Sequence, residues 1–325
     1  MIKTAFTEML GIRHPIALAG MGGGTSPDLV AAVTNAGGLG VLGVSDSPPE
    51  QLGALVEELR AKAKGPYGLN LLLNFMNAEE IDAVLDTRPA VFSTAWAGDH
   101  QDLKAIFARA HDRGARVVHM VPSVADAEKA AEAGADVIVA QGTDGGGHIG
   151  LMGTVVIVPA VARAVAPIPV LAAGGLADGR GLAAMLVLGA AGVYMGTRFL
   201  ATPEAPVHDR IKKLIVDSDG TDTIVTDVGD IMVGSDWPGA LGRVSRNRVV
   251  ERWLGRTNEL RRRREELRPK MVEARNQGDL DEAVIYYGQS AALIDEILPA
   301  AKVVEQVASD AEAILRERLP SLVAR

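Results

Sequence analysis

Short apolar runs alternate with longer amphipathic segments through the first two thirds of the chain. This alternation is typical of βα units that build a parallel sheet. Eight strands are predicted, at residues 16–19, 40–43, 67–73, 91–93, 116–121, 137–140, 169–172 and 192–195. Helices are predicted between them, at residues 28–36, 50–62, 78–86, 102–113, 124–133, 155–165 and 180–188. The pattern therefore predicts an α/β protein.

Eight strands with intervening helices fit a closed (β/α)8 barrel, the TIM barrel. The alternative is a doubly wound sheet, which usually has fewer strands and a Gly-x-Gly-x-x-Gly turn after the first strand. Here the first turn contains Gly20, Gly22 and Gly24 but has Thr25 where the third glycine of that motif belongs. We therefore expect a TIM barrel, with the doubly wound sheet as the alternative.

The alternation of strand and helix patterns ends after residue 199, and the composition changes. Residues 217–230 are acidic and rich in threonine, and charge-dense residues 251–275 predict a helix. Further helices are predicted at 279–298 and 300–319. We expect a barrel domain at residues 1–204, a mainly helical cap at 205–300, and a last helix at 301–325 that returns to the barrel.

Charge and composition exclude several classes of function. Four consecutive arginines at 261–264 are interleaved at helical spacing with Glu259, Glu265 and Glu266, which is typical of a solvated helix face. The formal net charge of −8 also argues against a nucleic-acid partner. The chain has no Cys, which excludes disulfides, thiolate catalysis and Cys-based metal sites.

No metal-binding or serine-nucleophile motif is found, so a bound organic cofactor is expected to carry the chemistry. Residues 1–13 carry three charges and do not resemble a signal peptide, and no apolar stretch is long enough for a membrane span. We expect a cytoplasmic protein without membrane attachment. The oligomeric state is left open by the sequence.

Glycine-rich turns follow the predicted seventh and eighth strands. Gly174 and Gly175 follow the seventh, while Gly196 and Thr197 follow the eighth. In a TIM barrel these two turns often bind a phosphate, and their backbone N–H groups are suitable donors. The alternative is that both are tight turns with glycine for steric reasons. Their occurrence at the two phosphate-site strands favours a binding role.

The run from Gln141 to Gly150 follows the predicted sixth strand. Its three consecutive glycines, 145–147, offer a surface without side chains that suits the face of a planar ring, and His148 follows directly. A histidine there can act as a base or a hydrogen-bond donor near neutral pH. His148 is the leading catalytic candidate. The second is His119, which lies within the fifth strand and is able to line the barrel interior.

These segments together resemble the nitronate monooxygenase family, formerly called 2-nitropropane dioxygenases. The same signature is similar to flavin-dependent enoyl-acyl-carrier-protein reductases and to NADH:quinone reductases. The resemblance spans nearly the whole chain and rests on 37–40, 141–150, 172–179, 195–199, 288–290 and 293–295.

The resemblance implies a TIM barrel that binds FMN without a covalent bond. It assigns the FMN phosphate to Gly174, Gly175, Gly196 and Thr197, and the isoalloxazine ring to a place between two loops. The ring and ribityl contacts implied are Gly20, Met21, Gly22, Asn70, Gln141, Gly146 and Gly147. It also implies that His148 contacts the substrate and abstracts the proton next to a nitro group. For the substrate side of the cap, we expect roles for Tyr286, Tyr287 and Gln289, with helix packing as the alternative for the tyrosines.

Two positions depart from the family pattern. Many relatives carry Glu at the position of Asp144, and some carry Lys at the position of Met120. We expect an FMN-dependent nitronate monooxygenase that uses O₂, and the alternative is an NAD(P)H-dependent reductase of a quinone, an enoyl thioester or a related CoA substrate. A flavin-binding storage or regulatory protein is a third hypothesis, which an ionisable His148 at the ring disfavours.

Overall fold

The structure is a computed structural model that describes residues 1–45, 47–235, 237 and 239–323. Its centre is a sheet of eight parallel strands in the order β1-β9-β8-β6-β5-β4-β3-β2. All eight predicted strands are present. They are β1 (Ile16–Leu18), β2 (Gly40–Gly43), β3 (Tyr67–Leu72), β4 (Val91–Ala95), β5 (Arg116–Val121), β6 (Val137–Gln141), β8 (Val170–Ala173) and β9 (Gly192–Met195).

The sheet closes into a barrel between β1 and the start of β2. The Leu18 N–H donates to the Leu39 carbonyl, and the Leu39 N–H donates to the Ile16 carbonyl, each at 2.9 Å. Inward-pointing side chains from every strand except β3 form a buried cluster in the interior, so the barrel is a packed core and not a pore. This interior cluster is Phe6, Ile12, Ala17, Leu39, Val41, Val91, Val118, Val137, Val139, Leu171, Ala173 and Tyr194. The TIM barrel prediction is confirmed.

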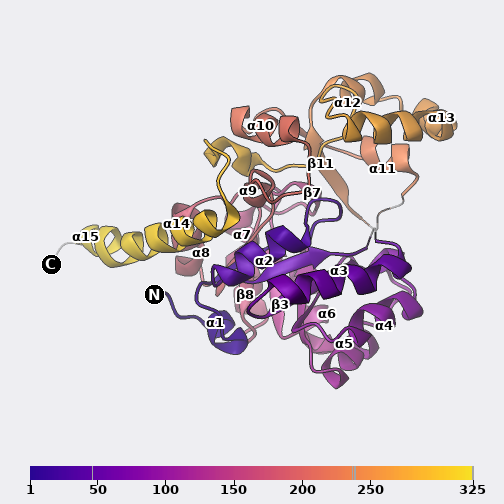
Figure 1. The fold of residues 1–325 in the computed structure, drawn as a ribbon. Helices are drawn as coiled ribbons and strands as arrows, with labels where there is room; N and C mark the ends of the chain where they lie inside the picture. Colours follow the sequence, from indigo (N-terminus) through magenta and orange to yellow (C-terminus); the bar gives the residue numbers. More distant parts are fainter. Residues whose placement is uncertain (46, 236, 238, 324–325) are drawn as a thin grey trace.

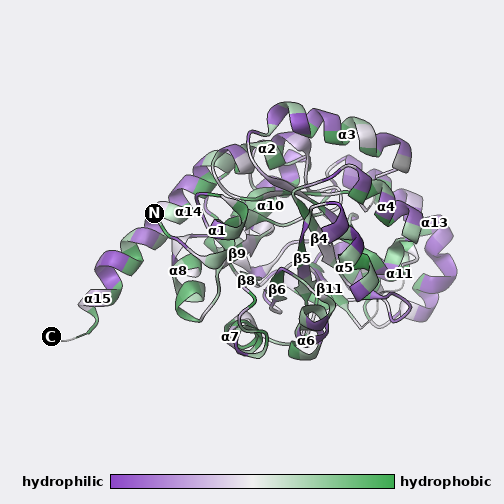
Figure 2. Ribbon diagram, turned by 90° about the horizontal axis from the view of Figure 1, so that it is seen from below, coloured by the Kyte–Doolittle hydropathy of each residue, from purple (hydrophilic) through white to green (hydrophobic). Residues whose placement is uncertain are grey.

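Helices surround the barrel and bury one apolar face each against the strands (Figure 2). Several begin at a side-chain cap; for example, the Ser26 hydroxyl accepts the Leu29 N–H at 3.1 Å. A short helix, α1 (Ala5–Leu10), brings Phe6 into the interior cluster. The outer helices are α2 (Pro27–Asn35), α3 (Pro49–Lys62), α4 (Ala78–Asp86), α5 (Leu103–Asp112), α6 (Val124–Ala133), α7 (Thr154–Ala164) and α8 (Gly179–Val187).

The segment after the barrel lies against one end of it (Figure 1). Its helices are α9 (Thr197–Leu200), α10 (Asp209–Asp217), α11 (Val228–Val233), α12 (Arg248–Trp253) and α13 (Thr257–Asn276). It also contains two antiparallel strands, β10 (Thr223–Thr226) and β11 (Leu241–Ser245), which the sequence did not predict. β11 pairs in addition with β7 (Gly147–Ile149), so the loop after β6 and the cap share one small sheet. The division into three domains remains a prediction.

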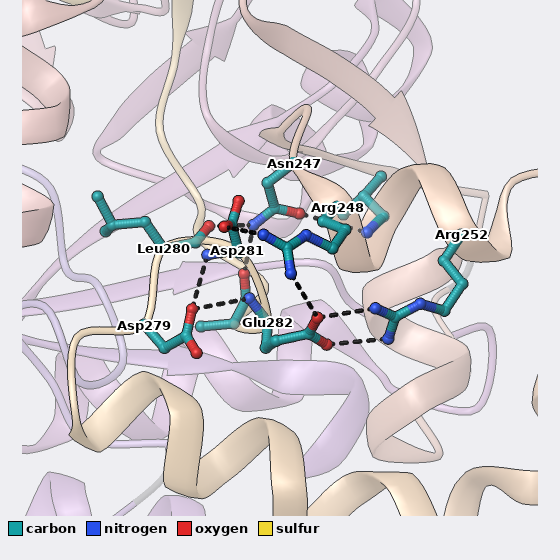
Figure 3. Close-up of polar contacts among 9 residues, drawn as sticks. Asn247, Arg248, Arg252, Asp279, Leu280, Asp281 and Glu282 are labelled. Atoms are coloured by element: carbon teal, nitrogen blue, oxygen red, sulfur yellow. Dashed lines mark hydrogen bonds and ion pairs between the residues drawn. The ribbon is translucent and has the colours of Figure 1, made fainter.

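The helix predicted at 279–298 is wrong. These residues, all of them described, form an extended segment with a single 3-10 turn, η2 (Gln289–Leu293). Tertiary hydrogen bonds hold the segment: the Asn247 side-chain amide donates to the Leu280 and Ala283 carbonyls, each at 2.7 Å. Arg248 and Arg252 of α12 pair with Asp281 and Glu282 of the segment (Figure 3). These contacts position the residues that follow, which reach the candidate site.

The last helix, α14 (Ala300–Ala313), continues as a π-helical turn, η3 (Ile314–Arg318), and ends in α15 (Leu319–Ser321). Val303, Val304 and Val307 are buried against the barrel helices, as their spacing predicts. α14 lies so close to α8 that a Cβ on Gly179 would stand 2.5 Å from the Ala311 nitrogen. Among the residues that the structure describes, none of the helices combines the length and apolar character needed to span a bilayer.

Candidate active site

His148 lies at the junction of barrel and cap. It stands on strand β7, not in a loop as expected, and pairs with Gly242 of β11. Its Nε2 lies 2.7 Å from Oδ1 of Asp230, a residue of α11 that is 82 positions away in the sequence. Both side chains are largely shielded from water, with 12% and 7% of their surfaces exposed. The structure therefore assembles a histidine–carboxylate pair that the sequence did not reveal.

The carboxylate determines which ring nitrogen of His148 is available. An ionised Asp230 only accepts hydrogen bonds, so in neutral His148 the proton resides on Nε2 and the lone pair on Nδ1. Nδ1 can then take a proton from a substrate, and the carboxylate stabilises the resulting imidazolium. His148 is thus prepared to act as a base through Nδ1.

Two aromatic side chains adjoin this pair. Trp237 stacks on the His148 ring at 3.3 Å between centroids and 12° between planes. Tyr286 lies on another side of the ring, at 5.7 Å between centroids. Burial raises the pKa of the Tyr286 phenol, and the nearby charge of Asp230 raises it further. Tyr286 therefore stays protonated and remains a hydrogen-bond donor at physiological pH.

Arg243 fastens β11 to the loop after β6. Its guanidinium donates to the Thr143 carbonyl from Nε at 3.1 Å and from a terminal nitrogen at 2.8 Å. The other terminal nitrogen donates to the Thr223 hydroxyl at 3.0 Å. Arg243 belongs to no recognisable sequence motif. The pairing of β11 with β7 places it beside the loop after β6.

A buried polar network holds the first turn at the mouth of the barrel. The Gly20 N–H donates to the Tyr194 hydroxyl at 3.0 Å, and that hydroxyl lies 3.2 Å from the Ser93 hydroxyl. The Ser93 hydroxyl donates to the Asn70 side-chain oxygen at 2.8 Å, and the Asn70 side-chain amide donates to the Gly20 carbonyl at 3.4 Å. Tyr194 and Ser93 were missed, although polar residues at inward strand positions are the signal that could have found them.

The other residues of the first turn lie as follows. The Met21 sulfur would be 3.1 Å from a Cβ on Gly196, so the Met21 side chain covers the end of β9. The Gly22 nitrogen would be 2.9 Å from a Cβ on Gly43, which places Gly22 against β2. The structure thus brings together the end of β9 and the first turn.

The predicted phosphate turn after β8 lies against the loop after β6. Gly174 and Gly175 adopt positive φ values of 96° and 72°, a conformation that favours glycine. A Cβ on Gly174 would stand 2.8 Å from the Gly142 carbonyl, so the two loops are in contact. Asp144 accepts the Thr154 N–H at 3.0 Å at the start of α7, which gives this departure from the family a capping role.

The residues present fit a flavin. The side-chain oxygen Oε1 of Gln141, at the end of β6, is buried and has no hydrogen-bond partner, as expected for an acceptor reserved for a ligand. Gly147 has φ of 74° and open space where a Cβ would stand. Backbone donors at Gly174 and Gly196 lie at strand ends where phosphates bind in TIM barrels.

Two other candidate residues contact the extended part of the cap near Gly288 and do not border open space. A Cβ on Gly146 would stand 2.5 Å from the Gly288 nitrogen, so this glycine allows two backbones to approach. The Thr197 hydroxyl accepts the Gly288 N–H at 2.9 Å. Tyr287 is 1% exposed and packs in the apolar cluster beneath α10, whereas Gln289 is exposed.

His119 does not line the barrel interior, which corrects the expectation. Its side chain points to the outer helices, where the ring packs on Phe107 of α5 and Nδ1 lies 2.7 Å from the Thr94 hydroxyl. Its neighbour Met120 packs against the interior cluster. Burial lowers the pKa of His119 to about 4. His119 is therefore a neutral, structural histidine.

A family model described as nitronate monooxygenase matches residues 3–81 and 73–310. The chain belongs to the nitronate monooxygenase family. It is accordingly a flavin-dependent oxidoreductase that acts on small molecules. Within the residues that the structure describes, no group of three or more potential ligands could hold a metal ion.

Curated relatives of this family member carry two kinds of name. The chain is 38% identical, over 77% of its length and 68% of the relative's, to "(3aS,4S,5R,7aS)-5-hydroxy-7a-methyl-1-oxo-octahydro-1H-indene-4-carboxyl-CoA dehydrogenase" of Mycobacterium tuberculosis. The protein of the same name from Rhodococcus jostii is 40% identical over 65% of this chain, which spans only 59% of that relative. A probable nitronate monooxygenase of Staphylococcus aureus is 32% identical over 77% of this chain and 80% of the relative.

Solved structures agree with the fold over nearly the whole chain. FabK from Thermotoga maritima has a TM-score of 0.89 at 34% identity and covers 99% of this chain and 100% of its own. The nitroalkane oxidase from Streptomyces ansochromogenes has a TM-score of 0.82 at 25% identity, with coverages of 98% and 100%. The fold of this chain is therefore similar to that of both enzymes over nearly its whole length.

Proposed function

We propose that the protein binds FMN and oxidises alkyl nitronates, with O₂ as the electron acceptor. The observation that carries the proposal is the His148–Asp230 pair, in which a carboxylate at 2.7 Å leaves Nδ1 of the imidazole as a base beside the flavin loops. The family of the chain supports a nitronate as the substrate. FMN, when bound, supplies the acceptor for the electrons of the substrate.

Residues at the ends of five barrel strands would hold FMN. The phosphate would lie on the backbone N–H groups of Gly174, Gly175, Gly196 and Thr197, which offer one compact anion site. The buried oxygen of Gln141 would accept a hydrogen bond from the ring or the ribityl chain. Asn70 and the Gly20-Met21-Gly22 turn would border one side of the ring, and Gly146 and Gly147 the other. These turns provide a site for one terminal phosphate, and the sequence contains no second glycine-rich helix start that would bind a pyrophosphate. The site therefore favours FMN over FAD.

His148 would handle the proton on the reacting carbon. With a neutral nitroalkane, Nδ1 takes the proton from the carbon next to the nitro group, and the electron pair of the broken C–H bond moves onto the nitro oxygens to give the nitronate. Asp230 stabilises the imidazolium that results, and the new Nδ1–H can donate to a nitronate oxygen. With a preformed nitronate, only this orienting role remains. Tyr286, as a protonated neighbour, would help to hold Asp230 in place.

A CoA thioester is the second candidate substrate, with NAD(P)H or NAD(P)⁺ as the partner in the electron transfer. It is favoured by the name of the 38% identical relative, a carboxyl-CoA dehydrogenase. A thioester carbonyl acidifies its neighbouring C–H bond as a nitro group does, so the same histidine base would serve.

The cofactor is tested first. The purified protein, or protein incubated with FMN, is expected to show the two-band flavin spectrum and to release FMN, not FAD, on denaturation. Gly175→Glu should lose the flavin, because it adds a negative charge at the phosphate site and its Cβ would stand 3.0 Å from that of Asp144. Tightly bound FAD would contradict the proposal.

The substrate is tested by anaerobic mixing of the flavin-loaded protein with one partner at a time. We expect alkyl nitronates to bleach the flavin, and readmitted O₂ to restore its colour with formation of the carbonyl product. Bleaching by NADH or NADPH, followed by reoxidation with an enoyl thioester or a quinone but without reaction of nitronates, would favour the reductase. Bleaching by none of these would favour a flavin storage or regulatory protein.

A further inference from the structure

Two of the three tryptophans of the chain gather beside His148. Trp96 follows the C-terminal end of β4, and Trp237 lies between α11 and β11. They are joined by Phe75 of the 3-10 turn η1 (Leu73–Phe75), which follows the C-terminal end of β3. The third tryptophan, Trp253, is buried in the apolar core of the cap. Aromatic residues are only 4% of this chain, so a group of three large rings, one of which stacks on His148, is a marked concentration.

Trp237 connects the other two rings to His148. Its ring meets Phe75 edge-on at 4.9 Å and Trp96 edge-on at 6.0 Å, while one face stacks on His148 at 3.3 Å. The two edge-on contacts are a preferred arrangement for aromatic pairs. Phe75 and Trp96 come from barrel strand ends and Trp237 from the cap. The three side chains, hereafter the aromatic cluster, therefore line the junction at which His148 stands.

The backbone at Trp96 is held in an unusual conformation. Its φ is +54°, in the left-handed region that bulky residues rarely adopt, and its carbonyl accepts the Asn74 N–H at 2.8 Å. Such conformations persist where the surrounding structure enforces them, and they cluster at functional sites. Trp96 itself is 8% exposed, so its ring is directed into the junction and not into solvent.

The aromatic cluster is not a closed core. Phe75 leaves 38% of its surface exposed although it is large and apolar, and Trp237 is half-buried. Pure packing between barrel and cap would favour full burial of these rings. Apolar surface that stays open beside a polar catalytic group is typical of a substrate pocket, where a few polar groups orient the ligand and apolar walls bind its body.

We propose that Phe75, Trp96 and Trp237 form a subsite for the apolar body of the substrate, so that the enzyme prefers substrates with a ring or a bulky alkyl group on the reacting carbon. A carbon positioned for proton transfer at Nδ1 of His148 has its other substituent within reach of Trp237, because that ring is stacked on the imidazole. The inference rests on the proposed function only in that His148 marks the reacting carbon. It applies equally to a nitronate and to a thioester.

The first experiment measures kcat/KM for a series of nitronates of increasing size, derived from nitroethane, nitrocyclohexane and phenylnitromethane. We expect kcat/KM to rise at least tenfold from the smallest to the two ring substrates. Trp237→Ala and Phe75→Ala should each reduce this ratio several-fold, whereas Trp237→Phe should largely retain it. Val272→Ala, on the exposed face of α13, is the matched control that should leave the ratio unchanged.

The second experiment does not require turnover. Carboxylates resemble nitronates in shape and charge but are inert, so calorimetry with the flavin-loaded protein compares the Kd of acetate with that of cyclohexanecarboxylate. We expect the ring compound to bind at least tenfold more tightly, and Trp237→Ala to remove most of this preference. Thermal unfolding of each variant checks that the protein is folded, and Phe75→Ala replaces Trp237→Ala in this comparison if the latter does not fold.

The outcomes separate the two proposals. Turnover of nitronates without size preference, or with a preference that folded Trp237→Ala and Phe75→Ala variants keep, would overturn the aromatic subsite and leave the proposed function standing. Failure of every nitronate, together with a carboxylate preference that depends on Trp237, would overturn nitronate oxidation and support the subsite. Equal Kd values for the two carboxylates would count against the subsite in either case.

Discussion

Replacement of Asp230 by Asn is the sharpest test of the histidine–carboxylate pair. The substitution keeps the size of the side chain but exchanges an ionised acceptor for an amide. The amide can donate an N–H to Nε2 of His148, which would move the imidazole proton to Nδ1. The nitrogen that we propose as the base in the parent protein would then carry a proton and could not accept one from the substrate.

The structure indicates a large effect. The His148–Asp230 contact is 2.7 Å long, and the two side chains are only 12% and 7% exposed, so water screens the interaction little. Loss of a positioned base costs about a hundredfold to ten-thousandfold in rate, and we expect kcat for a neutral nitroalkane to fall within this range. For a preformed nitronate, the loss should be about tenfold, since only orientation and charge stabilisation are affected.

The assay compares kcat on a nitroalkane and on its nitronate for the parent protein, Asp230→Asn and Asp227→Asn. Asp227 is a matched control because it precedes the same short helix, α11, but is 42% exposed and lies 3.9 Å from Arg261. Flavin content is measured in each variant to confirm that the cofactor site is intact. The control should behave like the parent protein with both substrates.

Two results would refute the reasoning. If Asp230→Asn lowered both activities equally while it retained the flavin, the carboxylate would not select the tautomer that proton abstraction requires. If His148→Ala retained the flavin and full activity with a neutral nitroalkane, His148 would not be the base at all. In the second case, the proton would have to leave through another group near the flavin.

Three further predictions concern other parts of the structure. Burial lowers the pKa of His119 from 6.5 to about 4, so the unfolded chain binds the proton more readily than the folded protein. As the pH falls from 6.5 to 4, the free energy of unfolding should therefore decrease by up to about 3 kcal/mol. Urea titrations of His119→Gln should show a flatter pH dependence of the free energy of unfolding. Gly146→Ala should lower the melting temperature and weaken flavin binding, because the new Cβ would stand within 2.5 Å of the backbone of the cap segment. Gly153→Ala is the control: a Cβ there meets nothing within 4 Å, so this variant should change neither property. Tyr286→Phe should alter kcat, since the Tyr286 phenol adjoins the His148–Asp230 pair. Tyr287→Phe should mainly alter stability, because the Tyr287 ring is 1% exposed in an apolar cluster. The reverse pattern would exchange these roles.

The barrel could be predicted because its signals are local. Each strand is a short apolar run bounded by turn residues, and each outer helix carries its own apolar face. Several outer helices also begin at a side-chain cap, as in α2 with Ser26. Most element ends were correct within a residue or two; the third strand, for example, was expected at 67–73 and spans Tyr67–Leu72. The glycine turn after β8 could also be predicted, since the positive φ of Gly174 and Gly175 favours glycine whatever the rest of the fold does.

Only the tertiary structure decided how the site is assembled. Asp230 reaches His148 across 82 residues, and β7 exists only because β11 pairs with it, so neither has a local signature. Residues 279–298 have helix-like apolar spacing, yet Asn247 and the close approach of Gly146 to Gly288 hold them extended. The direction of the His119 side chain likewise depends on which face of β5 meets α5. Local sequence determines elements and turns, whereas contacts between distant segments determine which side chains meet, because their energy depends on partners that no short stretch of sequence contains.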